Sequence, residues 1–250
     1  MIRGIIVSIL LFTMFACSPS LNTAQMTMQE HLDYAMSLYE DEDYQYAVTE
    51  FQALILQYPG SAINDDAQFY LGMTYFKKGQ YLLAVYEFSK LIRDIPASEF
   101  VPESQYMLAE SYYELSPHYS LDQQYTKKAI DEFQAFIDFF PTNDKVEDAE
   151  QKIAVLNDKL AEKEYNNAVI YERMEYYRAA TKYYEEVAEI YHDSKYAPLA
   201  LYRRANILIQ RNETQDAITD INMFLSRYPD NEYAPEMKEL LEKLQDKDGI

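Results

Sequence analysis

One pattern occurs five times along this chain and restricts its fold more than any other feature of the sequence. In each copy an alanine is followed four residues later by a large apolar residue. The alanines are Ala47, Ala84, Ala129, Ala180 and Ala217, and the large residues are Phe51, Phe88, Phe133, Tyr184 and Ile221. Residues i and i+4 lie on one face of an α-helix, where the small side chain lets a second helix approach and the large one fills the space beside it. The pattern therefore predicts five repeats built from closely packed helices.

The end of each copy is also recognisable. Seven residues after the large apolar residue, the copies read Tyr58-Pro59, Ile95-Pro96, Phe140-Pro141, Tyr191-His192 and Tyr228-Pro229. A serine or asparagine follows two positions later, at Ser61, Ser98, Asn143, Ser194 and Asn231. Proline ends a helix because it lacks the backbone N–H, and serine and asparagine are preferred N-caps. Each copy is therefore expected to end one helix and cap the next.

The second copy resembles the tetratricopeptide repeat. Its matching residues are Leu71, Gly72, Tyr75, Gly79, Tyr81, Ala84, Phe88 and Pro96. The same template fits the other copies less completely. Five glycines against 25 tyrosines also disfavour turn-rich β folds. The expected fold is all-α, a tetratricopeptide-like α-solenoid of five helical hairpins.

Successive alanines of the pattern are 37, 45, 51 and 37 residues apart, so two repeats carry extra residues. Residues 116–123 supply the first excess and contain a proline, which predicts a loop inside the third hairpin. Residues 144–174 contain neither proline nor glycine, and their apolar positions predict one long helix that links repeats three and four. We accordingly expect repeats one to three in residues 29–143, and repeats four and five with a C-terminal helix in residues 164–245.

The N-terminus predicts a lipoprotein. Residues 1–17 combine a positive charge with an apolar run too short to span a bilayer, as in a signal peptide. Met14-Phe15-Ala16-Cys17 resembles a lipobox, which implies S-diacylglycerol and N-palmitoyl groups on Cys17, the only cysteine in the sequence. Cleavage at another place, for instance after Ala24, is the alternative. Residues 18–28 are polar and are expected to form a flexible tether.

Charge and missing motifs exclude several classes of function. The chain carries 42 acidic and 22 basic side chains, so nucleic acids and anionic lipid headgroups would repel it. We therefore expect the acyl chains on Cys17 to make the contact with the membrane. The sequence contains none of the motifs HExxH, GxGxxG, GxxxxGK and GxSxG. We therefore expect a protein-binding scaffold rather than an enzyme, with no cofactor and no metal.

The tetratricopeptide template also implies which side chains line the concave groove of the solenoid. In the first three repeats these are Leu32, Met36, Tyr39, Phe69, Met73, Phe76, Tyr106, Glu110 and Tyr113. The later repeats supply Tyr165, Val169, Glu172, Tyr202, Asn206 and Ile209. Methionine adapts its shape and aromatic rings cover area at low entropy cost, so the first set suits an extended apolar peptide. Burial of these side chains between the repeats is the alternative.

The lipobox, the five repeats and the long helix after the third repeat together resemble the BamD family of outer membrane assembly lipoproteins. The likeness is most specific between Phe133 and Ala180. It implies a lipoprotein of the outer membrane that faces the periplasm. Its N-terminal repeats would receive targeting segments of unfolded β-barrel proteins, and its C-terminal repeats would bind the periplasmic domains of the insertase BamA. Other Bam lipoproteins are further partners that the resemblance implies.

Two residues depart from that family pattern. Tyr183 stands where the family commonly has an arginine, and His192 replaces the terminating proline. No partner-binding residue is therefore assigned in the fourth repeat. The alternative to the BamD-like interpretation is another periplasmic adaptor lipoprotein of tetratricopeptide type, one that serves cell-wall hydrolases or cell division.

Overall fold

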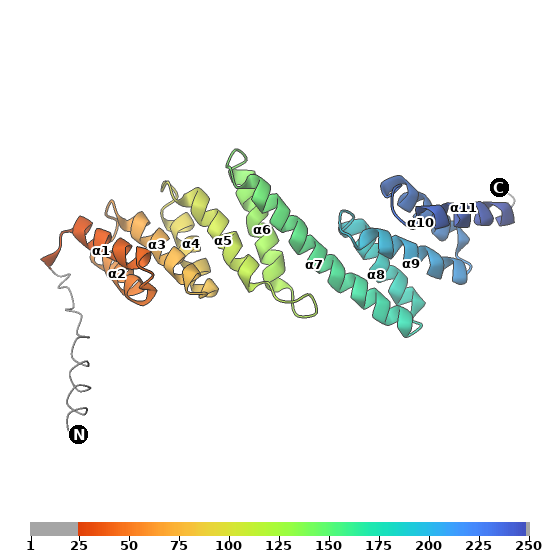
Figure 1. Ribbon diagram of the computed structural model, residues 1–250, viewed down its shortest axis with the longest axis horizontal. Helices are drawn as coiled ribbons and strands as arrows, with labels where there is room; N and C mark the ends of the chain where they lie inside the picture. The colour runs from red at the N-terminus through yellow and green to blue at the C-terminus, as the bar shows by residue number, and fades with distance from the viewer. Residues whose placement is uncertain (1–24, 249–250) are drawn as a thin grey trace, which may run out of the picture.

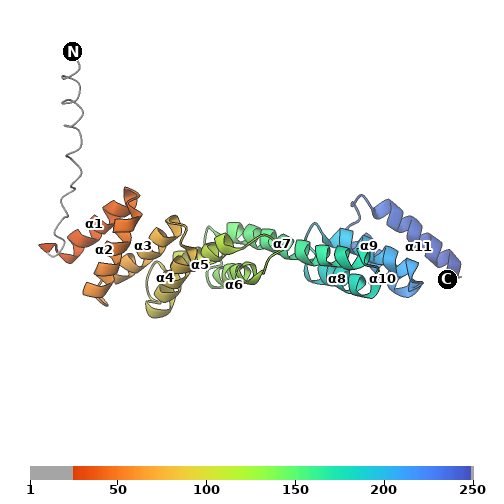
Figure 2. The same ribbon diagram turned by 90° about the horizontal axis from the view of Figure 1, so that it is seen from below.

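The structure is a computed structural model that describes residues 25–248, and every regular element in this range is an α-helix. The helices are α1 (Met28–Glu40), α2 (Tyr44–Gln57), α3 (Asn64–Lys77), α4 (Tyr81–Asp94), α5 (Val101–Leu115), α6 (Gln124–Phe139), α7 (Val146–Arg173), α8 (Tyr177–Ile190), α9 (Ala197–Gln210), α10 (Thr214–Arg227) and α11 (Ala234–Asp248). They follow one another along an elongated molecule (Figures 1 and 2). Cys17 and most of the expected tether lie outside the described residues.

Each helix packs mainly on its neighbours in the sequence, as in other solenoids. The pairs α1/α2, α3/α4, α5/α6, α7/α8 and α9/α10 form five hairpins, and α11 packs on α10. Within the described residues, no helix is long and apolar enough to cross a bilayer. The predicted all-α, tetratricopeptide-like solenoid is confirmed.

The repeated alanine and large apolar residue form the centre of every hairpin. All ten of these side chains have no exposed surface. Gly72, on α3 of the second hairpin, allows an even closer approach, because a Cβ built there would lie 2.7 Å from Cε1 of Phe88. The i and i+4 spacing thus has the packing role that the sequence predicts for it.

The long helix α7 takes part in two separate cores. Ala149 and Leu156, in its first half, belong to the core of α1–α6. Ala161 and Ala168, in its second half, belong to a core shared with α8 and α9. We call α1–α6 with the first half of α7 the N-terminal block, and the remainder of the described chain the C-terminal block. One continuous helix therefore connects two packing units.

The inserted loop of the third hairpin, residues 116–123, is fastened to α7. Lys159 Nζ donates to Ser116 Oγ at 2.8 Å, and Lys163 Nζ donates to the carbonyl oxygen of Leu121 at 2.6 Å. The side-chain amide of Gln123 donates to three carbonyl oxygens of the same loop. These bonds hold the loop along the helix that joins the two blocks.

The predicted N-caps are wrong in detail. The helices begin three residues after each serine or asparagine, and α3, α5, α7 and α9 lack a side-chain hydrogen bond from their N-cap residue. Asn143 Oδ1 instead accepts from the backbone N–H of Lys145 at 3.0 Å, and Asn231 Oδ1 from that of Tyr233 at 3.1 Å. Asparagine readily bonds the backbone two residues on, so these side chains stabilise the turn before the helix.

Candidate binding surfaces

Three residues predicted to line the groove lie in the core, which corrects the prediction for them. Leu32, Phe69 and Tyr106 are only 6%, 6% and 8% exposed. Neighbouring rings cover the two aromatic ones. The Phe69 ring stacks on Phe100 with centroids 4.6 Å apart, and the Tyr106 ring meets Phe136 edge-on at 5.4 Å. These three residues hold the hairpins together and offer little surface to a ligand.

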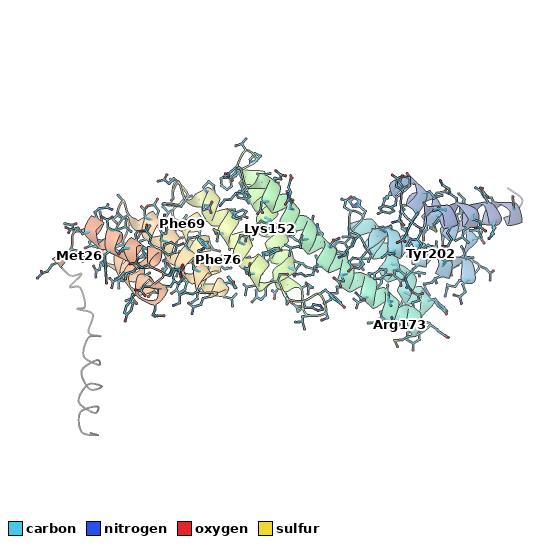
Figure 3. The ribbon with its side chains drawn as sticks, viewed as in Figure 1. Met26, Phe69, Phe76, Lys152, Arg173 and Tyr202 are labelled. Carbon is cyan, nitrogen blue, oxygen red and sulfur yellow. The ribbon has the colours of Figure 1, made fainter. Side chains whose placement is uncertain are left out.

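Five apolar residues among the other groove positions of the first three repeats are half-buried and pack on the core of the N-terminal block. We call Met36, Tyr39, Met73, Phe76 and Tyr113 the Met/aromatic strip. They come from α1, α3 and α5, the first helices of the three hairpins; Figure 3 labels Phe76. Tyr39 contacts Tyr70 edge-on at 5.6 Å, and Phe76 contacts Tyr81 at 5.3 Å. The rings are therefore held in place while part of each side chain remains accessible.

Lys152 of α7 lies beside Tyr113, at the third-hairpin end of the Met/aromatic strip; Figure 3 labels it. Its Nζ donates to Tyr106 Oη at 2.9 Å and to Glu110, and lies 5.7 Å from the centre of the Tyr113 ring. Burial lowers the pKa of Lys152, but the bonds to Glu110, Tyr106 and Asp148 outweigh it and raise the pKa above its usual value. Glu110, the acidic residue predicted in the groove of the first three repeats, is thus the partner of a lysine that sequence reasoning did not place there.

A pocket of 480 Å³ opens on the C-terminal block, and we call it the C-terminal pocket. Its lining comes from α7, α9 and the turn before α11, and consists of Tyr165, Glu172, Leu199, Tyr202, Arg203, Asn206, Ile207, Gln210 and Tyr233. Tyr165, Glu172, Tyr202 and Asn206 belong to the set that the template implied for the later repeats. Val169 and Ile209 of that set are half-buried outside this lining. Arg203, Gln210 and Tyr233 were not anticipated.

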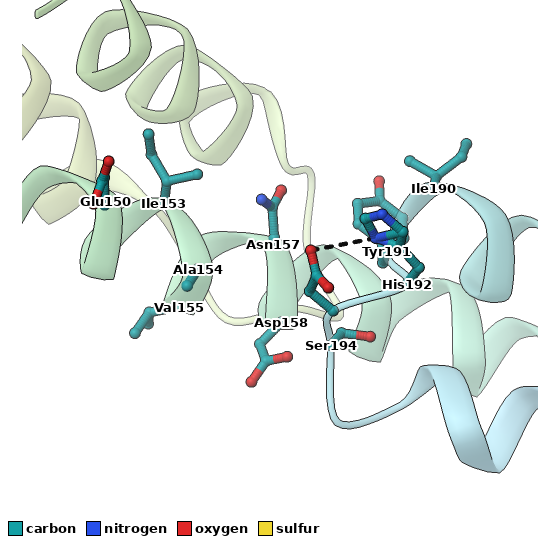
Figure 4. A pocket seen from close by; sticks show the side chains of 11 residues that line it. Glu150, Ile153, Ala154, Val155, Asn157, Asp158, Ile190, Tyr191, His192 and Ser194 are labelled. Atoms are coloured by element: carbon teal, nitrogen blue, oxygen red, sulfur yellow. Dashed lines mark ion pairs between the residues drawn. The ribbon is translucent and has the colours of Figure 1, made fainter. Parts of the chain in front are cut away.

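A second hollow, which we call the α7 notch, lies between α7 and the turn from α8 to α9 (Figure 4). Its volume is 410 Å³. The α7 side contains Glu150, Ile153, Ala154, Val155, Asn157 and Asp158, mostly from one face of the helix, and the turn contributes residues 190–194. Val155 and Ile190 are 52% and 60% exposed, so the notch presents apolar surface beside acidic groups. The core that α7 shares with α8 includes Ala161 and Ala168 of its second half, and the notch lies beside the first half.

A set of buried polar pairs was also missed. Three residues after the repeated alanine, four of the five repeats carry an acid that meets a side chain of the preceding helix. The pairs are His31 with Glu50 at 2.7 Å, Gln68 with Glu87, Gln105 with Glu132 at 2.8 Å, and Arg204 with Asp220. The acids recur at the repeat spacing, which is the sequence signal for them. Such internal pairs fix how the two helices of a hairpin meet.

The fourth repeat has Tyr183 at the position of that acid. Its ring stacks on Tyr171 with centroids 5.2 Å apart and 10° between the planes. His192, the other departure from the family pattern, lies in the α7 notch, where its Nδ1 is 3.3 Å from Asp193 Oδ2 (dashed line in Figure 4). His192 therefore lies beside the first half of α7, near the junction of the two blocks, whereas Tyr183 lies against the end of α7 within the C-terminal block.

The most perturbed carboxylic acid is Asp220, which is 2% exposed. Burial raises its pKa to about 6, although the neighbouring Arg204 acts in the opposite direction and Glu185 adds to the rise. Asp220 is enclosed between helices and lines none of the three surfaces described above. In residues 25–248, no group of three or more His, Cys, Asp or Glu side chains is placed to hold a metal ion.

Solved structures of similar architecture include a thermophilic TPR protein of Thermus thermophilus, with 15% identity, a TM-score of 0.37, and coverage of 87% of this chain and 98% of that chain. The TPR2AB domain of yeast Sti1 in its pHSP90 complex has 16% identity, a TM-score of 0.44, and coverage of 87% and 83%. A tetratricopeptide repeat protein of Parabacteroides merdae has 16% identity, a TM-score of 0.39, and coverage of 89% and 73%. All three scores are low, so the fold assignment rests on the helices of this chain.

An open stack of helical hairpins, with grooves and hollows along its length, defines a protein of the tetratricopeptide-like scaffold class. The family model described as YfiO, outer membrane lipoprotein, matches residues 24–215. The chain therefore belongs to the YfiO family of outer membrane lipoproteins, the family that corresponds to BamD. No curated protein matches the sequence.

Proposed function

We propose that the chain is a lipid-anchored scaffold of the outer membrane β-barrel assembly machinery, facing the periplasm. It binds the periplasmic domains of the insertase BamA and the targeting segments of unfolded barrel proteins. The observation that carries this proposal is the family match over residues 24–215, which includes four repeats and the long α7. Other Bam lipoproteins are further partners in the proposal, and it requires neither a catalytic step nor a cofactor.

The Met/aromatic strip is the proposed receptor for unfolded barrel segments. Barrel strands alternate apolar and polar residues and carry aromatic residues near the membrane interfaces. The side chains of such a strand form one apolar face, which Met73, Phe76 and their neighbours can cover. These half-buried side chains already pack on the core, so they lose little conformational entropy when a peptide binds.

The α7 notch is the proposed docking place for a folded insertase domain. One side of the notch is a face of α7 on which Ile153 packs toward the core of the N-terminal block while Val155 is exposed. The exposed side chains Val155 and Ile190 would be covered by a partner of domain size, and exposed apolar surface of this kind marks interaction sites. The notch shares no residue with the Met/aromatic strip, so we expect both partners to bind at the same time.

The anchor is the proposed lipid on Cys17, which lies outside the described residues. Several acyl chains hold a lipoprotein firmly, and the net charge of −20 offers no second attraction to anionic headgroups. Full-length protein expressed with an epitope tag should therefore fractionate with the outer membrane, whereas Cys17→Ala should be recovered in the soluble fraction. Membrane retention of Cys17→Ala would contradict the proposed anchor.

Affinity purification after cross-linking in cells tests the scaffold function itself. The expected result is recovery of an insertase that has periplasmic repeat domains, together with unfolded barrel proteins. Recovery of cell-wall hydrolases or division proteins without an insertase would instead support the alternative adaptor function. A purification from the Cys17→Ala strain controls for contacts made only because the protein is confined to the membrane.

Charge placed in the strip should weaken peptide binding. Met73→Glu with Phe76→Glu puts two carboxylates where an apolar strand edge would lie, so affinity for a barrel-derived C-terminal peptide should fall by tenfold or more, that is by about 1.4 kcal/mol or more. Fluorescence anisotropy of the labelled peptide measures this. Tyr46→Glu with Tyr86→Glu, on exposed faces of α2 and α4, is the matched control. Unchanged affinity with unchanged helicity would assign Met73 and Phe76 to packing alone.

A further inference from the structure

The C-terminal pocket differs in chemistry from the Met/aromatic strip. Its centre is Arg203, whose Nη1 donates to Glu172 Oε2 at 3.0 Å. A guanidinium has five N–H donors in one plane, and the other donors of Arg203 have no protein partner within residues 25–248. The side chain is about two-fifths exposed, so these donors can be reached by a ligand. The N-terminal strip contains no comparable group.

Glu172 does not cancel this capacity. Its Oε2 accepts from both Arg203 and the hydroxyl of Tyr184, the latter at 2.5 Å. The Tyr184 hydroxyl is neutral, so Glu172 and Arg203 balance each other's charge, and Glu172 orients the guanidinium from one side while the remaining N–H donors of Arg203 stay available. A second carboxylate can then accept hydrogen bonds from the free N–H groups on another side of the planar guanidinium.

The remaining lining residues suit a peptide backbone. Asn206 and Gln210 follow Arg203 by three and seven residues, so all three lie on one face of α9. Asn206 Nδ2 already donates to the carbonyl oxygen of Tyr202 at 2.9 Å, so its second N–H, its Oδ1 and the Gln210 amide are the groups that remain for an extended chain. Beside them, Tyr202 stacks on Tyr233 with ring centroids 4.3 Å apart, which forms a rigid aromatic wall. The pocket volume of 480 Å³ lies in the usual range for ligand sites, roughly 300–1,000 Å³.

We propose that the C-terminal pocket binds an extended peptide segment through a carboxylate, which Arg203 receives while Asn206 and Gln210 bond the adjoining backbone. This inference goes beyond the proposed function, because it assigns a second peptide site of polar chemistry to the C-terminal block. A segment that carries an acidic side chain or a free C-terminus fits it, and a purely apolar segment does not.

The test compares two forms of one probe. The fluorescein-labelled hexapeptide Ser-Thr-Val-Thr-Val-Tyr is prepared with a free C-terminal carboxylate and as the C-terminal amide, and each is titrated with the detergent-solubilised full chain. The carboxylate form is expected to bind about tenfold more tightly. Arg203→Gln should abolish that difference. Equal affinity of the acid and the amide for the unaltered protein would overturn the proposal.

Gln210 provides a test that does not depend on the Arg203–Glu172 pair. It is exposed at the end of α9, so changing it should not disturb the fold. Gln210→Lys should strengthen binding of the carboxylate probe several-fold, and Gln210→Glu should weaken it several-fold. Gln57→Glu, at the exposed end of α2, is the matched control and should change nothing. If Gln210→Lys weakens binding of the probe and Gln210→Glu strengthens it, Glu172 receives a cationic ligand, and this result would also overturn the proposal.

The two peptide sites can be separated. Met73→Glu with Phe76→Glu should leave the difference between acid and amide unchanged, because those residues are in the N-terminal block. If the strip variant weakens a barrel-derived peptide while the acid and the amide bind alike, the proposed function stands and the present inference fails. Loss of the acid preference in the strip variant would refute a separate second site.

Discussion

Gly72→Ala should destabilise the protein by about 2 kcal/mol and lower its Tm by about 4 to 8 °C, although alanine is the better helix former. The reason is the contact inside the second hairpin. A Cβ at position 72 would lie 2.7, 2.9 and 3.0 Å from three carbons of the Phe88 ring. Phe88 is fully buried, so neither the ring nor the backbone can move without disturbing the core. The strain outweighs the gain in helix propensity, which is about 1 kcal/mol.

Thermal unfolding followed by circular dichroism measures this effect. Gly79→Ala is the control for backbone conformation. Gly79 has φ +69°, and no atom lies within 4 Å of the position of its missing Cβ. This substitution should therefore destabilise the protein by about 1 kcal/mol through backbone strain alone. Phe88→Leu removes ring atoms from the contact. The double variant Gly72→Ala with Phe88→Leu should therefore be less destabilised than the sum of the two single variants. A Gly72→Ala protein as stable as the original would contradict this close packing of α3 on Phe88.

Asp220→Asn should stabilise the protein by about 2 kcal/mol at pH 7.5 and remove most of the pH dependence of stability that Asp220 causes. Burial raises the pKa of this acid from 3.8 to about 6, despite Arg204. A raised folded-state pKa means that the folded protein holds the proton more tightly than the unfolded chain. The contribution to stability is then complete below pH about 4 and is lost as the pH rises through 6.

Asparagine resembles the protonated acid, so the variant keeps that stability at neutral pH. The advantage of Asp220→Asn should shrink as the pH falls from 7.5 to 4, and urea unfolding at several pH values would show it. Asp131→Asn, at an exposed position of α6, is the matched control and should have little effect at any pH. If Asp220→Asn destabilises equally at all pH values, the ion pair with Arg204 outweighs the cost of burying the acid.

The fold could be predicted because its signals are short-range. The pairs of alanine and large apolar residue at i and i+4, and the prolines that follow, act within one hairpin, and each turned out to be buried or to end a helix where expected. The N-cap prediction failed at Asn143 and its counterparts. Turn geometry there depends on three intervening residues, which composition does not specify.

The candidate sites were predicted less completely. The template placed Leu32, Phe69 and Tyr106 in one column with Tyr202, yet the first three are buried and Tyr202 borders the C-terminal pocket. Exposure at these positions depends on what covers each hairpin. Phe100 covers Phe69, whereas Tyr233 stacks beside Tyr202 and leaves the pocket open. Such contacts join residues more than thirty positions apart.

The sequence by itself determined that this protein is a helical solenoid of five repeats, because the repeat is a local pattern that each hairpin obeys independently. Only the tertiary structure decided where the solenoid can bind. It placed Lys152 over the third hairpin, divided the core within α7 and opened a pocket around Arg203. These outcomes depend on how one hairpin is rotated on the next, and that rotation is the sum of many long-range contacts that no single repeat contains.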